Sequence, residues 1–144
     1  MPYISLLEVQ EKMELEVKGS QGYKMLFHSR EHDKNKWLSY YSVTLIAPSM
    51  EATVRVDNAP YGVSPVNLFS EISEQWKGWE GEKSWGSLEG EFNLSVKNDS
   101  VGHVIFFTSV QTEAYPQNSK MVIEFEVELG QLEYLKKQAV EFFK

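Results

Sequence analysis

Hydrophobic and polar residues alternate along much of this chain with a period of two, which is typical of half-buried β-strands. The clearest case is the segment 121–129, where the apolar residues point one way while Glu124, Glu126 and Glu128 point the other. This pattern predicts a strand with one buried face and one acidic face. The same alternation predicts strands at 13–17, 23–27, 52–56 and 88–96.

Two further segments, 37–46 and 103–112, are apolar at both parities, which predicts central strands covered on both faces. The strands at 13–17 and 23–27 are separated by a short segment with a glycine at each end, which predicts a hairpin. The polar run 29–36 is predicted to be a loop. The connections between neighbouring strands are short, which favours antiparallel pairing over parallel crossovers.

A helix is predicted to begin at Ser64, because serine can accept a free backbone N–H and Pro65 is well tolerated in the first turn. Its apolar residues recur at helical spacing, at Phe69, Ile72, Trp76 and Trp79. Gly78 interrupts this spacing, so the helix is expected to end near Lys77. We expect Trp76 to be buried, so that replacing it with alanine would destabilise the domain strongly.

A second helix is predicted at the end of the chain, after Gly130. Its apolar face consists of Leu132, Leu135, Ala139 and Phe142. The order of elements is therefore strands, helix, strands, helix. This order predicts a single α+β domain over residues 1–144, with two helices packed side by side on one face of a mostly antiparallel sheet.

Composition narrows the classes of function. The chain has 144 residues, no cysteine and a net charge of −7. It therefore lacks disulfides and thiolate chemistry, and the absence of a long apolar run predicts a cytoplasmic protein with no membrane partner. The acidic charge disfavours nucleic acid and favours a basic protein partner, although it also suits a purely solubilising surface.

Candidate catalytic chemistry is sparse. His28, Glu31 and His32 match the H-x-x-E-H pattern of inverted zinc proteases, which requires both histidines on one helical face. The surrounding residues show no helical stripe, so we interpret the match as coincidental and predict no catalytic residue, no metal and no cofactor. His103 begins an apolar strand and is interpreted as a structural histidine, with a general base or metal ligand as the alternative.

The aromatic residues after the first predicted helix allow two interpretations. Trp79 and Trp85 can belong to a structural core, or they can line a ligand or partner site, since tryptophan is a common interface anchor. The strand glutamates can keep an open sheet face soluble or steer a cationic partner. The predicted partner-binding residues are Glu124, Glu126, Glu128, Trp79, Glu80, Glu82 and Trp85.

A set of short motifs resembles a family of small bacterial proteins of unknown function, and more distantly the WapI-like immunity proteins of polymorphic toxin systems. The motifs are Trp37-Leu38, the helix through Trp76, Gly78-Trp79-Glu80-Gly81 with Trp85 and Leu88, Gly102-His103-Val104 and Gly130-Gln131-Leu132. The resemblance covers roughly 37–143 and leaves the amino-terminal hairpin outside. It implies a strand-helix-strand-helix fold and a binding role, and it transfers no catalytic residue.

Three hypotheses follow. The leading one is a non-catalytic cytoplasmic binding protein, an immunity protein that neutralises a basic toxin domain by tight association. The alternative is a small-ligand-binding or enzymatic domain with a pocket lined by Trp79, Trp85 and His103. The third is a homodimer formed through an exposed sheet edge.

Overall fold

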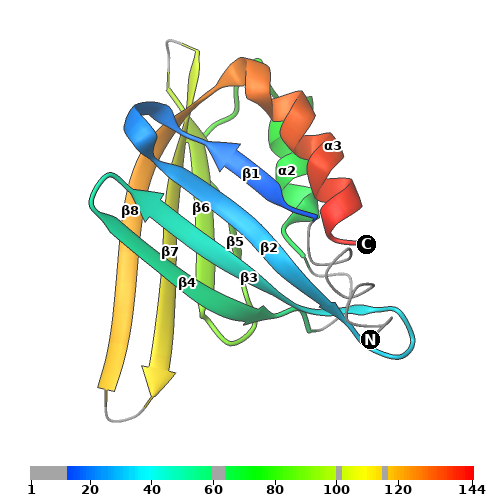
Figure 1. The fold of residues 1–144 in the computed structure, drawn as a ribbon. Helices are drawn as coiled ribbons and strands as arrows, with labels where there is room; N and C mark the ends of the chain where they lie inside the picture. Colours follow the sequence, from blue (N-terminus) through cyan, green and yellow to red (C-terminus); the bar gives the residue numbers. More distant parts are fainter. Residues whose placement is uncertain (1–12, 60–63, 100–101, 115–116) are drawn as a thin grey trace.

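The computed structural model describes residues 13–59, 64–99, 102–114 and 117–144 (Figure 1). The first sheet contains, in spatial order, β1 (Leu15–Lys18), β2 (Lys24–His32), β3 (Leu38–Ala47) and β4 (Met50–Asp57). The second sheet contains β5 (Lys83–Gly86), β6 (Phe92–Asn98), β7 (His103–Ala114) and β8 (Gln117–Glu128). The helices are α2 (Val66–Glu74) and α3 (Leu132–Phe142), and the 3₁₀ turns are η1 (Ser20–Gly22) and η2 (Leu129–Gln131).

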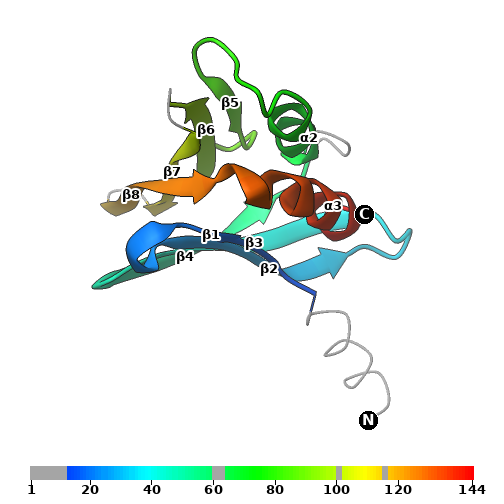
Figure 2. The same cartoon turned by 90° about the horizontal axis from the view of Figure 1, so that it is seen from above.

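The predicted α+β fold with mostly antiparallel strands and two helices is confirmed. The expectation of a single sheet is wrong, because the strands before α2 and the strands after it form two separate four-stranded sheets. Seen from above, these sheets form two layers (Figure 2). Alternation along a strand shows which side chains share a face, but it does not show which strands become neighbours, so it could not predict this division.

The two sheets face each other with their apolar sides. In the first sheet, Met25 is paired with both Val17 and Leu45, and these three side chains are fully buried. In the second sheet, Phe106 pairs with Phe125 on the inner face, and their rings stack with centroids 5.6 Å apart. The strands β4 and β7 bring the two layers into contact.

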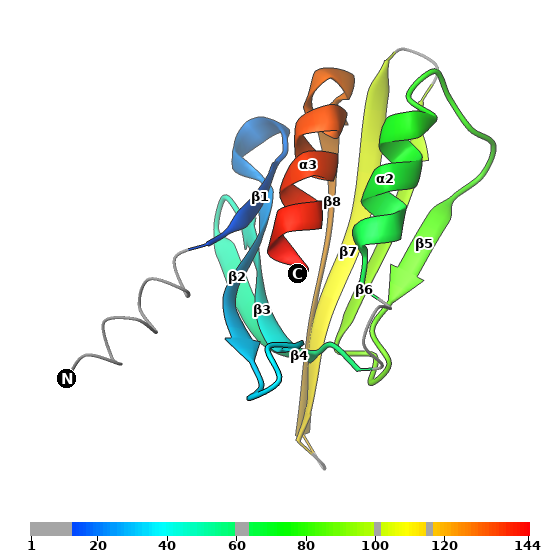
Figure 3. The ribbon, with the colours of Figure 1, turned by 90° about the vertical axis from the view of Figure 1, so that its right-hand side faces the viewer.

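The helices α2 and α3 lie side by side, as predicted, and close one side of the molecule (Figure 3). The helix α2 also packs against β5 of the second sheet, and α3 packs against β1 of the first sheet. The predicted apolar face of α3 is fully buried or nearly so, at Leu132, Leu135, Ala139 and Phe142.

Phe27 of β2 lies at the centre of the core. Its ring centroid lies 6.0 Å from that of Phe69 on α2, 5.6 Å from that of Phe92 on β6 and 6.0 Å from that of Phe142 on α3. These three contacts are edge-on, which is a favourable arrangement for aromatic rings. A single side chain of the first sheet therefore contacts both helices and the second sheet.

The first helix ends earlier than predicted, and this overturns the expected burial of Trp76. The N–H of Gln75 donates to the Glu71 carbonyl at 2.9 Å and closes the last turn, so Trp76 falls outside the helix. The Trp76 side chain is 54% exposed, whereas Phe69 and Ile72 are fully buried. Helical spacing assigned Trp76 to the buried face because nothing in the spacing marks the last helical residue.

Other boundaries differ in detail. The strand β2 continues to His32 through an irregularity after His28, where Ser29 adopts a positive φ of 53°, so part of the predicted loop is strand. The short strand β5 was not predicted. Leu88, which was assigned to a strand, is 69% exposed in the turn before β6. Across the described part of the chain, no helix is long and apolar enough to span a bilayer.

We predict opposite outcomes for two aromatic substitutions in and after α2. Phe69→Ala removes a fully buried ring and should lower the free energy of unfolding by about 3–5 kcal/mol. Trp76→Ala removes an exposed side chain and should lower it by about 1 kcal/mol or less. Urea unfolding of both purified variants checks this, and a larger loss for Trp76→Ala would contradict the assigned end of α2.

Candidate functional site

The second sheet has an outer face that neither α2 nor α3 covers (Figure 2), and the turn η1 borders it at β8. The pairing of the strands defines this face, because side chains that are paired across neighbouring strands point to the same side of the sheet. All of its members are half-buried or exposed, in contrast to the buried inner face. The outer face consists of Ser84, Gly86, Asn93, Ser95, Lys97, His103, Ile105, Phe107, Ser109, Gln111, Lys120, Val122, Glu124, Glu126 and Glu128.

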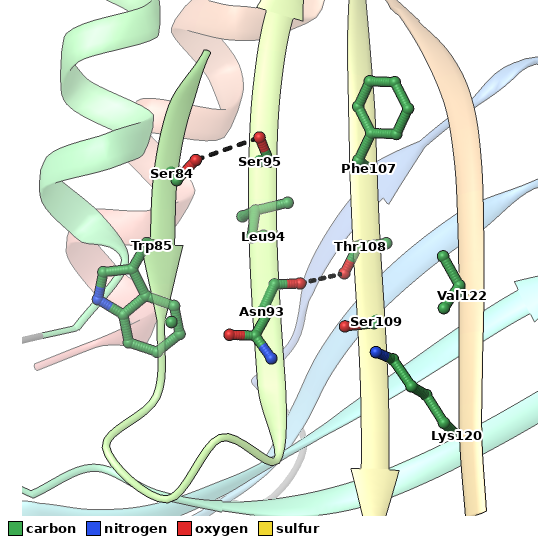
Figure 4. A pocket seen from close by; sticks show the side chains of 11 residues that line it. Ser84, Trp85, Asn93, Leu94, Ser95, Phe107, Thr108, Ser109, Lys120 and Val122 are labelled. Carbon is green, nitrogen blue, oxygen red and sulfur yellow. Dashed lines mark hydrogen bonds between the residues drawn. The ribbon is translucent and has the colours of Figure 1, made fainter.

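A shallow groove of about 480 Å³ crosses this outer face from β5 to β8 (Figure 4). Polar side chains line part of the groove, among them Ser84 and Ser95. The Ser84 hydroxyl donates a hydrogen bond to the Ser95 hydroxyl at 3.2 Å. Phe107 and Val122 supply apolar surface, and Val122 is 63% exposed. A shallow mixture of hydroxyl, amide and apolar groups suits contact with another protein better than enclosure of a small molecule.

The glutamates of β8 form an exposed row beside the groove. Glu124, Glu126 and Glu128 lie about 6.5–7 Å apart along the strand, because outward side chains alternate with inward ones. Glu124 and Glu126 form no ion pair with any residue that the structure describes. Glu128 lies 3.8 Å from the Nε2 atom of His103. The charges of this row therefore reinforce one another at the surface.

His103 is held by the turn between β6 and β7. Its backbone N–H donates to Asp99 Oδ1 at 2.9 Å, and its Nδ1 atom lies 3.3 Å from Asp99 Oδ2. Both ring nitrogens therefore face carboxylates, from Asp99 and Glu128. These contacts give His103 the geometry of a structural residue that fixes the start of β7.

The predicted pocket of Trp79, Trp85 and His103 is not assembled. Trp85 pairs with Leu94 on the inner side of β5 and packs on Phe92 with ring centroids 5.6 Å apart, whereas His103 lies on the outer face. The rings also occupy different positions along the strands, because Leu94 pairs with Thr108 of β7, five residues beyond His103.

Trp79 and the two following glutamates lie near the opposite edge of the second sheet from the β8 row. The Trp79 carbonyl accepts a hydrogen bond from the Asn98 side chain at 2.9 Å, and its half-buried ring packs on the core. Glu80 and Glu82 are exposed on either side of Gly81. The predicted partner-binding residues therefore form two separate groups, the β8 glutamates and the residues around Trp79. Trp85 points to the inner side but also lines part of the groove on the outer face.

The H-x-x-E-H residues lie on β2, and each binds a different partner. The Nε2 atom of His28 lies 2.7 Å from the Thr44 hydroxyl, and that of His32 lies 3.0 Å from the Lys144 carbonyl. Glu31 accepts two hydrogen bonds from Arg55, at 2.8 and 3.0 Å, and this pairing lowers the pKa of the Glu31 carboxyl. Across the described residues, no group of three potential metal ligands is found.

Sequence reasoning missed a groove of about 660 Å³ where α2 ends and α3 begins. Trp76 lines it together with Leu129 and Leu132, and its rim carries the ion pair between Lys136 and Glu74 at 3.2 Å. Gly78 predicted a helix end near Lys77, but it lies four residues after Glu74, the last helical residue, so it gave no signal of the earlier end.

We predict that the purified protein contains no stoichiometric zinc, because the His28, Glu31 and His32 side chains are directed to separate partners. Metal analysis after equilibration with zinc and removal of the excess should give far less than one ion per chain. His32→Ala should leave that value unchanged. One retained zinc per chain that disappears in His32→Ala would contradict the prediction and favour an enzyme.

The chain matches none of the curated proteins and none of the solved structures. The model of a family of unknown function, DUF6228, matches residues 16–144. The match includes the β1–β2 hairpin, which the resemblance in the sequence had left outside. It supports the predicted family of unknown function and shows no link to the immunity class. The chain belongs to this family of unknown function.

Proposed function

We propose that this protein is a non-catalytic binding protein that associates with a basic protein domain through the outer face of its second sheet. The observation that carries the proposal is the exposed glutamate row of β8 beside the groove, in which Glu124 and Glu126 form no ion pair with any residue that the structure describes. The like charges of an exposed row repel one another and therefore destabilise the fold slightly. They become favourable when a partner brings opposite charge to them.

The chemistry of the surface favours a protein partner. Phosphates would be repelled by Glu124 and Glu126, so nucleic acid does not suit this face. The groove offers Ser84, Asn93 and Ser95 as hydrogen-bonding groups around the apolar Phe107. This combination resembles a protein interface, in which an apolar centre is surrounded by polar groups.

The more specific proposal is that the partner is a toxin domain and that this protein confers immunity to it. The resemblance to WapI-like immunity proteins supports this, as does the acidic charge of the chain. A toxin that acts on nucleic acid must present a basic surface to its substrate, and an acidic sheet face is complementary to such a surface. Tight association over that surface would neutralise the toxin without any catalytic residue.

We predict that reversing the β8 row slows association with the partner. The partner to test is the carboxyl-terminal domain encoded by the gene immediately upstream. Replacing Glu124, Glu126 and Glu128 by lysine should lower the association rate constant by about tenfold or more at low salt. The rate should also become less sensitive to salt, because electrostatic steering has been removed.

The matched control reverses Glu51, Glu133 and Glu141, which are exposed outside the second sheet and change the net charge equally. Circular dichroism must show that both triple variants are folded. Equal association rates for the two variants would exclude the outer face as the binding surface. A metabolic gene in place of a toxin gene upstream would contradict the immunity assignment.

A further inference from the structure

The aromatic ring of Phe107 lies on the outer face of the second sheet, toward one end of the groove that crosses this face (Figure 4). The side chain is half-buried, so part of the ring is open to solvent. Lys120, the cation that lines the groove, lies toward the other end, where it pairs with Gln111. Phe107 therefore supplies an aromatic surface at the end of the groove where the row of β8 glutamates begins.

A carboxylate lies next to this ring. Phe107 pairs with Glu124 across β7 and β8, and side chains paired in this way have Cβ atoms about 4.5–5.5 Å apart. Glu124 is exposed and forms no ion pair within the described part of the chain. On the other side of the ring, Ser95 of β6 pairs with Phe107 and adds a hydroxyl group. The ring is therefore flanked on one face of the sheet by an acidic group and by a hydrogen-bonding group.

The ring already attracts a cation from the chain itself. The Nζ atom of Lys97 on β6 lies over the Phe107 ring, 5.0 Å from its centroid. Lys97 lies two residues beyond Ser95, the direct partner of Phe107, so its long side chain reaches the ring diagonally. An ammonium group over an aromatic face is a cation–π contact. The contact shows that the face of the Phe107 ring is accessible to a positively charged group.

Lys97 uses the ring but does not neutralise the neighbouring carboxylate. Its side chain is exposed, and it forms no ion pair with Glu124 or with any other residue that the structure describes. An ammonium is strongly hydrated, so an exposed cation–π contact of this kind is weak and easily displaced. A guanidinium is planar and more weakly hydrated, and it can stack on a ring while its N–H groups donate to a carboxylate. The ring and Glu124 together therefore suit a guanidinium better than the lysine that lies there.

We propose that Phe107 and Glu124 form the recognition site for an arginine side chain of the protein partner, and that Lys97 occupies the ring face until the partner displaces it. The inference rests on the proposed function and identifies the position on the binding face where a specific contact is added to general attraction. Phe107 stacks on the guanidinium, Glu124 accepts its hydrogen bonds, and Lys97 is an internal competitor. Glu126 and Glu128 contribute to electrostatic steering only.

The first test is a titration of the full chain with n-butylguanidinium, followed by the NMR shifts of the backbone amides. The comparison ligand is n-butylamine, which carries the same charge and should bind about threefold more weakly or worse. Phe107→Leu keeps an apolar side chain but removes the ring, so it should weaken guanidinium binding by about threefold or more. The absence of saturable binding, or equal binding by the wild type and Phe107→Leu, would overturn the proposal.

Lys97→Met is a variant with the opposite expected effect. It removes the internal competitor, so guanidinium binding should strengthen by about twofold or more. Lys34→Met is the matched control, because Lys34 is exposed in the turn between β2 and β3 and its replacement changes the net charge equally. The gain should vanish when Lys97→Met is combined with Phe107→Leu, since the competition requires the ring. An equal gain in Lys97→Met and Lys34→Met would show a response to net charge alone and would contradict the role of Lys97.

The last test uses the partner domain encoded by the upstream gene. Phe107→Leu should raise the dissociation rate constant by about threefold or more with little change in the association rate constant, because stacking forms only after the surfaces have met. An unchanged dissociation rate constant would show that the ring does not bind an arginine of the partner. Failure of the β8 charge reversal to slow association would remove the proposed function, whereas the guanidinium titration of the free chain would still decide whether the ring binds a guanidinium.

Discussion

The packing of Phe27 is the contact on which the arrangement of layers depends. Its ring meets Phe69 of α2, Phe92 of β6 and Phe142 of α3, so residues far apart in the chain converge on one side chain. Each such pair adds dispersion and edge-to-face attraction to the burial of apolar area. Because these contacts unite both sheets and both helices, a cavity at this position would loosen every layer together.

This central packing determines which surfaces remain available for binding. Each sheet buries one face in the shared core, and α2 and α3 close one side of the space between the sheets. The helices therefore do not cover the outer face of β5–β8. Edge strands in natural proteins are often protected by charge, and the β8 glutamates provide such protection as well as a field for a cationic partner. Stability of the sheet edge and recognition thus use the same residues.

Alternation allowed much of the fold to be predicted, because the side-chain period of a strand is a local property. It correctly placed the β8 glutamates outward and Phe125 inward. Local pattern could not predict the division into two sheets, which depends on contacts between the halves of the chain. It also placed Trp76 on the wrong side, because Trp76 lies two residues past the last helical residue, Glu74, where side chains no longer follow the helical direction.

The outer face would contribute to recognition in two ways. Glu124 and Glu126 are exposed to water, so their attraction for a cation is screened by salt and acts mainly on the rate of encounter. The groove beside them combines the apolar surface of Phe107 with the hydroxyl groups of Ser84 and Ser95. Contacts of this kind form only after the two surfaces have met, so they would affect the dissociation rate and the specificity more than the speed of association.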